Sequence, residues 1–297
     1  MNKLPIFCML VGLPGSGKTS FALSQKDKYD IISSDSIRKE LYGSERIQEN
    51  NNKVFEIMRK RAIEALKSGK NVIYDATNMT RKFRKTLLSS IKIDCKKVAC
   101  IIWAKYETCV LRDKNRNRTV GNEVLRRMIK SFQVPYYDEG WDEIRTIHTD
   151  ELYNESDYAR WVDCQHDNPH HDNTISEHIS KVCKEVSKLP YCNGFNQLFI
   201  AAYLHDIGKK FTKSFKNAKG EITEIAHFYD HQNVSSYLAV GFKTIQDLKE
   251  REKMLAIWLI NAHMEPFFNS KYYRNLSDNG AEKILLDKLH LCDKTGA

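Results

Sequence analysis

The sequence predicts an α/β domain, with a mostly parallel sheet covered by helices on both faces, followed by an all-α domain. Three observations lead to this prediction. An apolar run, a glycine-rich loop and a helix follow one another at the start; strand and helix patterns alternate to about residue 150; only helical spacing follows residue 174. Because 297 residues exceed the usual size of one domain, we expect domains over 1–150 and 174–297, joined by a polar linker, 151–173.

The first strand and helix enclose the most specific motif of the chain. The loop fits G-x-x-x-x-G-K-[ST] and follows a run typical of a buried strand. Glycines let backbone N–H groups turn toward phosphates, Lys18 adds a positive charge, and Thr19 offers a hydroxyl to Mg²⁺. The residues expected to bind the nucleotide are Gly12, Gly15, Ser16, Gly17, Lys18 and Thr19. The motif therefore predicts ATP and Mg²⁺ as ligands.

The remaining elements of the first domain follow in alternation. Strands are predicted at 5–11, 30–33, 71–75, 97–103 and 144–148. Helices are predicted at 18–25, 35–42, 51–68, 80–91, 106–117 and 121–133. Such alternation is typical of a parallel sheet with crossover helices.

Carboxylates stand at the ends of two of these strands. Asp35 follows the second strand, and Arg38 lies three positions later on the same helix face. We expect Asp35 to accept a proton from an attacking hydroxyl and Arg38 to bind an anionic part of the acceptor. Asp75, at the end of the third strand, suits Mg²⁺ or the acceptor, whereas the following Thr77 and Asn78 fit a functional role or a plain turn with an Asn cap equally well.

A basic stretch follows the fifth helix pattern. Arg112, Lys114, Arg116 and Arg118 precede the helix that begins near residue 121. Cations on a mobile segment can close over a triphosphate and stabilise charge during transfer. A solvated charged surface is the alternative.

The second half reads as helical throughout. Helices are predicted at 174–188, 195–207, 229–240, 246–263 and 280–293. The polar pair His205 and Asp206 ends an apolar helix, where burial without a partner would be costly. Imidazole and carboxylate are ligands of borderline divalent metals. The candidate set is His178, His205, Asp206, His231, His263 and Asp293, whereas His148, His166, His170, His227 and His290 are interpreted as ordinary core or surface residues.

Charge and composition restrict the class of protein. Residues 1–150 hold 29 Lys and Arg against 18 Asp and Glu, whereas residues 151–297 hold 18 against 20, so the excess positive charge of +9 lies in the first half. A basic half favours a nucleic-acid partner, or it is simply a solvated surface. The apolar residues form no membrane span, and the start lacks a cleavage site, so we expect a cytoplasmic protein with eight reduced cysteines.

The motifs of the first half together resemble the 5′-polynucleotide kinases of phage and bacterial RNA repair. The resemblance covers about residues 5–148 and rests on the glycine-rich loop, Ser-Asp-x-Ile-Arg, Asp-Ala-Thr-Asn, and a basic lid followed by Val-Leu-Arg-Arg-Met. It implies that Asp35 is the general base for a 5′-hydroxyl and that Asp75 is the second carboxylate of the site. Arg118 matches the principal lid arginine. Lys114 stands where the family has another arginine, so Arg116 is the substitute candidate.

The second half closely resembles the HD-domain metal-dependent phosphohydrolases over about residues 170–295. The signature is a His, then His-Asp, then a late Asp. The resemblance implies that His178, His205, Asp206 and Asp293 bind one metal, such as Mn²⁺, Ni²⁺ or Co²⁺. It places His231 and His263 at a second metal and gives Lys209 a role in neutralising phosphate or protonating the leaving oxygen.

These resemblances imply a bifunctional enzyme that heals broken RNA ends. The kinase would phosphorylate a 5′-hydroxyl, and the hydrolase would remove a 2′,3′-cyclic phosphate or 2′-phosphate, so that an RNA ligase could then join the ends. A small-molecule kinase fused to a nucleotide phosphohydrolase is the alternative. A nucleotide-gated switch without catalysis is disfavoured by Asp35.

Overall fold

The chain forms two compact units. The computed structural model describes residues 4–47, 50–116, 118–168 and 174–296. The first unit comprises Met1–Met128 and Pro135–Glu151, and the second comprises Ile129–Val134 and Leu152–Ala297. His170 lies outside the described residues.

The first unit is built on a five-stranded parallel sheet, which confirms the predicted fold class. Its strand order is β2-β3-β1-β4-β5. The strands are β1 (Ile6–Val11), β2 (Asp30–Ser33), β3 (Val72–Asp75), β4 (Lys96–Trp103) and β5 (Glu143–His148). β1, β3 and β4 are almost entirely buried, as expected of strands covered on both faces.

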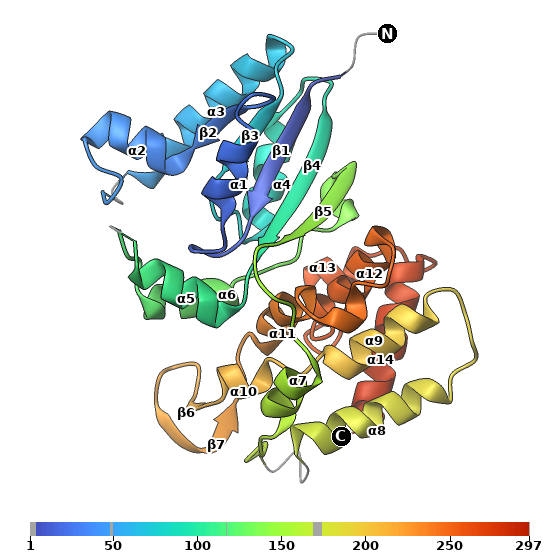
Figure 1. Cartoon of the computed structure of the whole chain (residues 1–297). Helices are drawn as coiled ribbons and strands as arrows, with labels where there is room; N and C mark the ends of the chain where they lie inside the picture. Colours follow the sequence, from blue (N-terminus) through green and yellow to red (C-terminus); the bar gives the residue numbers. More distant parts are fainter. Residues whose placement is uncertain (1–3, 48–49, 117, 169–173, 297) are drawn as a thin grey trace. The chain divides into compact units, whose positions relative to one another are not determined.

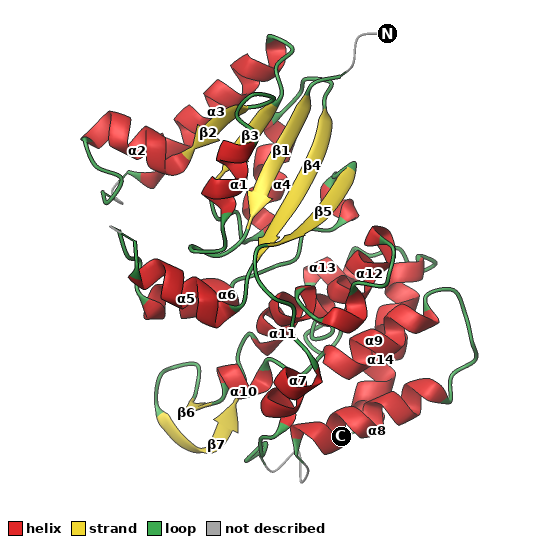
Figure 2. Cartoon of the chain, in the orientation of Figure 1, coloured by secondary structure: helices red, strands yellow, loops and turns green. Residues whose placement is uncertain are grey.

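Helices cover the sheet on both faces, α1 in front and α4 behind in the view of Figure 2. They are α1 (Lys18–Ser24), α2 (Ser34–Tyr42), α3 (Asn51–Lys67), α4 (Arg81–Ser90), α5 (Tyr106–Lys114), α6 (Asn122–Lys130) and the 3₁₀ helix η1 (Tyr137–Glu139). The last two residues of α6 belong to the second unit. Each predicted helix of this half is present, and most bounds differ by one to three residues.

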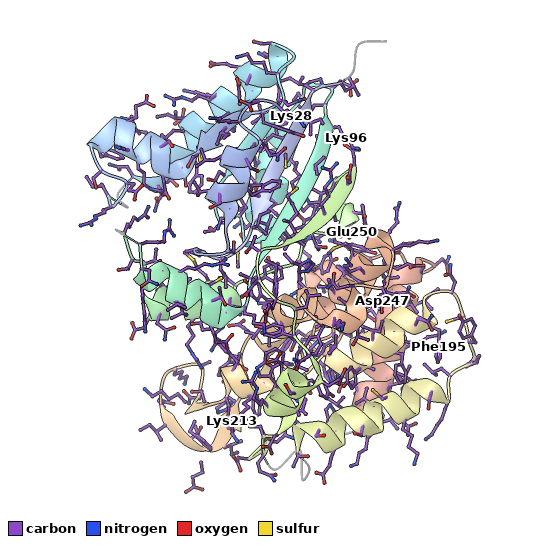
Figure 3. The ribbon with its side chains drawn as sticks, in the orientation of Figure 1. Lys28, Lys96, Phe195, Lys213, Asp247 and Glu250 are labelled. Carbon is purple, nitrogen blue, oxygen red and sulfur yellow. The ribbon has the colours of Figure 1, made fainter. Side chains whose placement is uncertain are left out.

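The glycine-rich loop lies at the carboxyl edge of the sheet, because it directly follows β1 (Figure 1). Lys28 and Lys96, at the amino ends of β2 and β4, lie at the opposite edge (Figure 3). Carboxyl ends of parallel strands meet at one edge of a sheet, where open α/β sheets bind their ligands. The polar residues that follow β1, β2 and β3 are therefore brought to the same place.

The second unit is mainly helical, as predicted. Its helices are α7 (Glu155–Val162), α8 (Ile175–Ser187), α9 (Phe195–Leu204), α10 (Lys209–Thr212), α11 (His231–Val240), η2 (Lys243–Ile245), α12 (Glu250–Ala262), α13 (Lys271–Arg274) and α14 (Ala281–Thr295). α9 packs against α8, α12 and α14, and α11 packs against α12. The apolar faces of these helices form the core, with residues such as Ile179, Leu198 and Ile257 fully buried.

Two features of the second unit depart from the sequence expectations. A two-stranded antiparallel hairpin, β6 (Ser214–Lys216) and β7 (Ile222–His227), interrupts the helices. Within the stretch expected to be a linker, residues 155–162 form α7, whose N-terminus has a capping box between Asn154 and Asp157. β6 has only three residues and the apolar residues of β7 do not alternate, so no period-2 pattern marks the hairpin, and α7 has only eight residues.

The cysteines of the described residues form no disulfide bonds with one another, and four of them are buried in the first unit. None of the helices in the described part of the chain has the length and apolarity needed to span a bilayer.

Candidate active sites

The glycine-rich loop has a backbone conformation that only glycine adopts without strain. Gly15 has φ of +81°, and a Cβ atom at this position would lie 2.6 Å from the carbonyl oxygen of Cys109. Any other residue there would be strained and would clash with backbone. The loop leads into α1, whose first residue is Lys18, so helix N–H groups also face the site.

Lys18, Thr19 and Asp75 form the centre of this site. Lys18 is buried, and its Nζ donates to the carbonyl oxygen of Leu13 at 2.7 Å. Thr19 Oγ1 donates to Asp75 Oδ2 at 3.3 Å, which places the hydroxyl and carboxylate expected at Mg²⁺ side by side. Burial lowers the pKa of Lys18 and raises the pKa of Asp75, and the attraction between the two charges opposes both shifts.

Asp35 lies in the first turn of α2 and is paired with two arginines. Arg38 Nη1 is 3.3 Å from Asp35 Oδ1, and Arg118 Nη1 is 2.7 Å from the same oxygen. Arg38 is itself held by Asn51, whose Oδ1 accepts from Nη2 at 2.8 Å. The arrangement brings together a carboxylate that can accept a proton and two cations that can bind phosphate groups.

The basic stretch after α5 contributes to the site unevenly. Arg116 and Arg118 line the pocket, whereas Lys114 does not number among the described residues that line it. Asp113 is buried, and its carboxylate accepts from the backbone N–H groups of Val120 and Gly121 at 3.0 to 3.2 Å. These bonds fix the loop that presents the arginines.

Arg112 has a positioning role that the sequence pattern did not distinguish from its neighbours. Its Nη1 donates to the carbonyl oxygen of Gly15 at 3.3 Å, and its Nη2 donates to the carbonyl oxygen of Thr149 at 2.8 Å. Thr149 Oγ1 in turn donates to the carbonyl oxygen of Ser16 at 2.8 Å. Arg112 and Thr149 therefore hold the glycine-rich loop in position through its carbonyl oxygens.

Thr77 and Asn78 have different environments: the first lines the pocket, and the second is buried at the end of the strands. Thr77 lines the pocket, and its carbonyl oxygen accepts from Gly12 N–H at 3.1 Å. Asn78 is buried with φ of +50°, and its Nδ2 donates to the carbonyl oxygen of Leu10 at 2.7 Å. Asn78 thus ties the end of β3 to the end of β1, and it does not cap α4, whose N-cap is Thr80.

The pocket enclosed by these residues has a volume of about 1100 Å³. It extends from the glycine-rich loop past Asp35 to Arg46 and Phe55. Ligand pockets are typically about 300 to 1,000 Å³. The cavity therefore has room for a nucleoside triphosphate together with part of an acceptor.

The second unit gathers the predicted His and Asp residues into one buried cluster. They come from five helices: His178 from the first turn of α8, His205 and Asp206 just after α9, His231 from the start of α11, His263 just after α12, and Asp293 from the last turns of α14. Thr174 and Glu177 form a capping box that fixes the start of α8. Gly208 allows α11 to come close, because a Cβ there would lie 2.5 Å from the His231 carbonyl oxygen.

Asp206 lies between two pairs of imidazoles. Its Oδ2 is 3.3 Å from both His178 Nε2 and His205 Nε2, and its Oδ1 is 3.2 Å from His231 Nε2 and 3.9 Å from His263 Nε2. Asp293 Oδ1 is 3.0 Å from His178 Nε2. The cluster thus offers two groups of metal ligands that share Asp206.

The orientations of the four imidazole rings suit divalent metal ions. Every Nδ1 faces a backbone carbonyl oxygen, at 2.8 Å for His205, His231 and His263 and at 3.3 Å for His178. A neutral imidazole that donates through Nδ1 has an acceptor at Nε2. Nevertheless Nε2 atoms approach in pairs, at 3.3 Å for His178 and His205 and 3.1 Å for His231 and His263. Cations beside each pair would relieve the repulsion between these acceptors.

Charge in the cluster is unevenly distributed. Burial opposes protonation of His205, but Asp206 and Asp293 outweigh it and raise the pKa of His205 to about 10. Burial, with His231 and His205 nearby, lowers the pKa of His263 to about 3. The carboxylates therefore attract positive charge most strongly toward the His178 and His205 side.

Lys209 and His166 lie against the cluster. Lys209 is buried, and its Nζ is 2.7 Å from Asp206 Oδ2 and 3.2 Å from His166 Nε2. His166 is fully buried, with its ring packed edge-on against those of His178 and Phe228. The sequence interpretation of His166 as ordinary missed its place here, because it lies in a segment without helical periodicity.

The fold and the two sites define the class of protein: a P-loop domain followed by a helical domain with a buried His and Asp cluster. Comparison with known protein families gives a match for each of the two domains. Residues 7–135 match the AAA domain family, and residues 185–292 match the HD domain family. The chain therefore combines a P-loop domain with an HD domain, as the motifs of its two halves predict.

Individual relatives each match about half of the chain. The chain is 30% identical over 148 residues to L-seryl-tRNA(Sec) kinase of Methanococcus maripaludis, a match that covers 45% of this chain and 55% of that protein. The chain thus spans about half the length of this curated relative. Among solved structures, it is similar to the Pnkp1/Rnl/Hen1 RNA repair complex, with 22% identity, a TM-score of 0.40 and 48% of each chain covered. A gluconokinase from Sinorhizobium meliloti 1021 has 19% identity and a TM-score of 0.34, with 50% of this chain and 83% of that chain covered.

Proposed function

We propose that this protein heals RNA ends: its P-loop unit phosphorylates a 5′-hydroxyl with ATP, and its HD unit removes a 2′,3′-cyclic phosphate or 2′-phosphate. The observation that carries the proposal is the presence of two separate constellations on one chain. One has Lys18 and Asp35 in a single pocket, and the other has Asp206 between two imidazole pairs. Two phosphate chemistries on one chain are useful when one substrate has two damaged ends.

In the first unit, Lys18 and Thr19 would bind the triphosphate and its Mg²⁺, with Asp75 beside them. Asp35 would accept the proton of the attacking hydroxyl, and Arg38 would bind an acceptor phosphate. Arg118, which pairs with Asp35, has to exchange this partner for a phosphate oxygen of ATP during transfer. Arg116 is the second lid cation proposed to contact ATP.

In the second unit, His178, His205, Asp206 and Asp293 would hold one metal ion, and His231, His263 and Asp206 a second. Ligands of this kind suit Mn²⁺, Ni²⁺ or Co²⁺. Such ions, when bound, activate water and neutralise the phosphate that it attacks. Lys209 would donate to a phosphate or leaving-group oxygen next to this centre.

Two features favour a nucleic-acid substrate. The excess positive charge of the chain lies in residues 1–150. The pocket of about 1100 Å³ extends past Asp35 to Arg38 and Arg46, which suit the phosphates of a strand. An RNA ligase would then act on the healed ends.

The test uses the purified full chain, [γ-³²P]ATP with a 5′-hydroxyl RNA, and separately an RNA ending in a 2′,3′-cyclic phosphate with Mn²⁺ or Ni²⁺. We expect Lys18→Ala to abolish phosphorylation and spare phosphate removal, and His205→Ala to do the reverse. Lys28→Ala, at the opposite edge of the sheet, and His227→Ala, outside the cluster, are matched controls. A folded variant that lost both activities would contradict the proposal.

A small-molecule kinase fused to a nucleotide phosphohydrolase is the second candidate. Salt separates the two, because neutralised phosphates make binding of a polynucleotide strongly salt-dependent. A KM for the acceptor that rises steeply between 50 and 200 mM salt, as is typical of about six or more phosphate contacts, supports the RNA substrate. Efficient phosphorylation of a sugar or nucleoside, unaffected by competing oligonucleotide, supports the alternative.

A further inference from the structure

The pocket of the first unit has two aromatic side chains among its described lining residues, Phe21 and Phe55. They differ in what they contact. Phe21 packs against the buried cluster formed by residues such as Leu10 and Ile73 of β1 and β3. Phe55 lies on α3, is half-buried, and has no part in that cluster. Its ring is therefore the aromatic surface that the pocket offers away from the sheet.

Phe55 belongs to the acceptor side of the pocket. Asp35 pairs with Arg38, and Arg38 Nη2 donates to Asn51 Oδ1 at 2.8 Å. Asn51 and Phe55 are four residues apart on α3 and therefore neighbours on one helix face. Asp35 and Arg38 are thus linked through Asn51 to the part of α3 that carries Phe55, and Asp35, Arg38 and Phe55 all line the pocket.

The nucleotide side of the pocket is different. There the glycine-rich loop is bordered by Arg112 and Thr149, which hydrogen-bond to its carbonyl oxygens. The γ-phosphate end of a bound triphosphate would lie near Lys18 and Thr19, with Asp35 in the same pocket. Phe55 lines the same pocket from α3, the helix to which Arg38 beside Asp35 is hydrogen-bonded, and an acceptor has to lie beside Asp35.

The ring of Phe55 is held in place by a second ring. The centroids of Phe55 and Phe83 are 5.1 Å apart, with an angle of 65° between the planes, an edge-to-face arrangement. Phe83 belongs to α4, so the contact joins two helices. A ring fixed in this way loses little conformational entropy when a flat ligand stacks on it.

We propose that Phe55 stacks on the nucleobase of the 5′-terminal nucleotide of the acceptor. This inference rests on the proposed function. A 5′-hydroxyl has to lie about 2.6 to 3.2 Å from Asp35 to transfer its proton, and the base on the same sugar is then carried toward α3. Every base has a π-face that can stack on an aromatic side chain, whereas a sugar acid or an aliphatic amino acid offers none. The pocket thereby selects a nucleoside at the acceptor terminus.

The test compares two RNA acceptors that differ only at the 5′ residue, one with a base and one abasic. With the base present, Phe55→Ala should raise the acceptor KM by about 5- to 150-fold, the range for loss of one base stack. The KM for ATP should not change. Phe55→Tyr should keep the wild-type KM. Phe55→Leu keeps a large apolar side chain at this position but has no π-face, so it should raise the KM as Phe55→Ala does. Phe215→Ala, an exposed aromatic residue of the second unit, is the control.

The abasic acceptor decides the outcome. Wild-type protein should bind it as weakly as Phe55→Ala binds the intact acceptor, and Phe55→Ala should cause no further loss. If Phe55→Ala and Phe55→Leu weaken both acceptors equally, or raise the KM for ATP, the stacking role is overturned while the proposed function stands. If the wild-type protein transfers phosphate to no 5′-hydroxyl nucleic acid, the proposed function fails, and this inference fails with it.

Discussion

The ion pair between Arg84 and Glu139 gives a prediction that tests how the carboxyl edge of the sheet is held. Both side chains are fully buried. Arg84 Nε and Nη2 donate to the two carboxylate oxygens of Glu139 at 2.7 and 2.6 Å. Arg84 Nη1 also donates to the carbonyl oxygens of Asn78 and Met79 at 3.1 Å each. The pair therefore fixes the chain shortly after Asp75, the last residue of β3.

Arg84→Met removes the charge and the donors while keeping an apolar stem. Glu139 would then be buried with the donor Trp141 Nε1 at 3.1 Å, and Arg81 Nη1 would be 4.0 Å from its Oε1. Removing one partner of a buried ion pair, which leaves the other charge buried and unpaired, lowers the free energy of unfolding by about 3 to 5 kcal/mol. For a unit of this size the loss corresponds to a decrease in Tm of roughly 10 °C or more. Kinase activity should fall with it, because the end of β3 loses its support.

The measurement is thermal or urea unfolding of the full chain, read on the transition that ATP shifts. The matched control is Arg61→Met. Arg61 makes an equally bidentate pair with Glu40, at 2.8 and 2.6 Å, but both side chains are about half exposed. Exposed pairs contribute about 0 to 1 kcal/mol, so this variant should unfold almost as the wild type does.

The double variant Arg84→Met, Glu139→Gln provides the refutation. It removes the unpaired charge, so it should recover part of the stability lost in Arg84→Met. If Arg84→Met and Arg61→Met destabilise the chain equally, burial is not what gives the first pair its importance. The reasoning would also be refuted if the double variant were less stable than Arg84→Met.

Three further predictions concern the sites. Asp35→Asn should lower the kinase kcat by about 10²- to 10⁴-fold and leave phosphate removal unchanged, measured by transfer from [γ-³²P]ATP; a kcat above one-tenth of wild type would exclude a general base. Asp206→Asn should lower the content of both metal ions, measured by mass spectrometry after dialysis, whereas His263→Ala should lower the content of one ion only. Equal losses in the two variants would argue against a carboxylate shared by both ions. His166→Phe should reduce phosphate removal by about 10- to 100-fold at unchanged metal content. His166→Gln should retain most of the activity, because its amide oxygen can accept from Lys209. Equal losses in the two variants would contradict a role of His166 in positioning Lys209.

The sequence was sufficient for features that lie within one local stretch or recur with a fixed period. The glycine-rich loop requires its residues side by side, so the site of Lys18 and Thr19 could be predicted. Asp35 and Arg38 are one helical turn apart, and their contact follows from the period of the helix. The alternation of strands and helices determined the parallel sheet, because parallel strands need crossover connections.

The metal cluster is an intermediate case. The residues His178, His205, Asp206 and Asp293 were predicted through a resemblance. No local pattern relates His178 to Asp293, because they are far apart in the sequence of the second unit. In the folded structure His178 Nε2 and Asp293 Oδ1 are 3.0 Å apart. The contact between His178 Nδ1 and the Gly296 carbonyl oxygen is likewise a tertiary feature, whereas His205, His231 and His263 each contact the carbonyl oxygen three residues earlier.

Only the tertiary structure decided the supporting contacts. Arg112 is one of four similar cations in sequence, and its bond to Thr149 joins residues 37 positions apart. His166 meets Lys209 across 43 positions, and Arg84 meets Glu139 across 55. Such pairs leave no period in the sequence, because the free energy that selects them comes from burial and hydrogen bonding after the elements have packed.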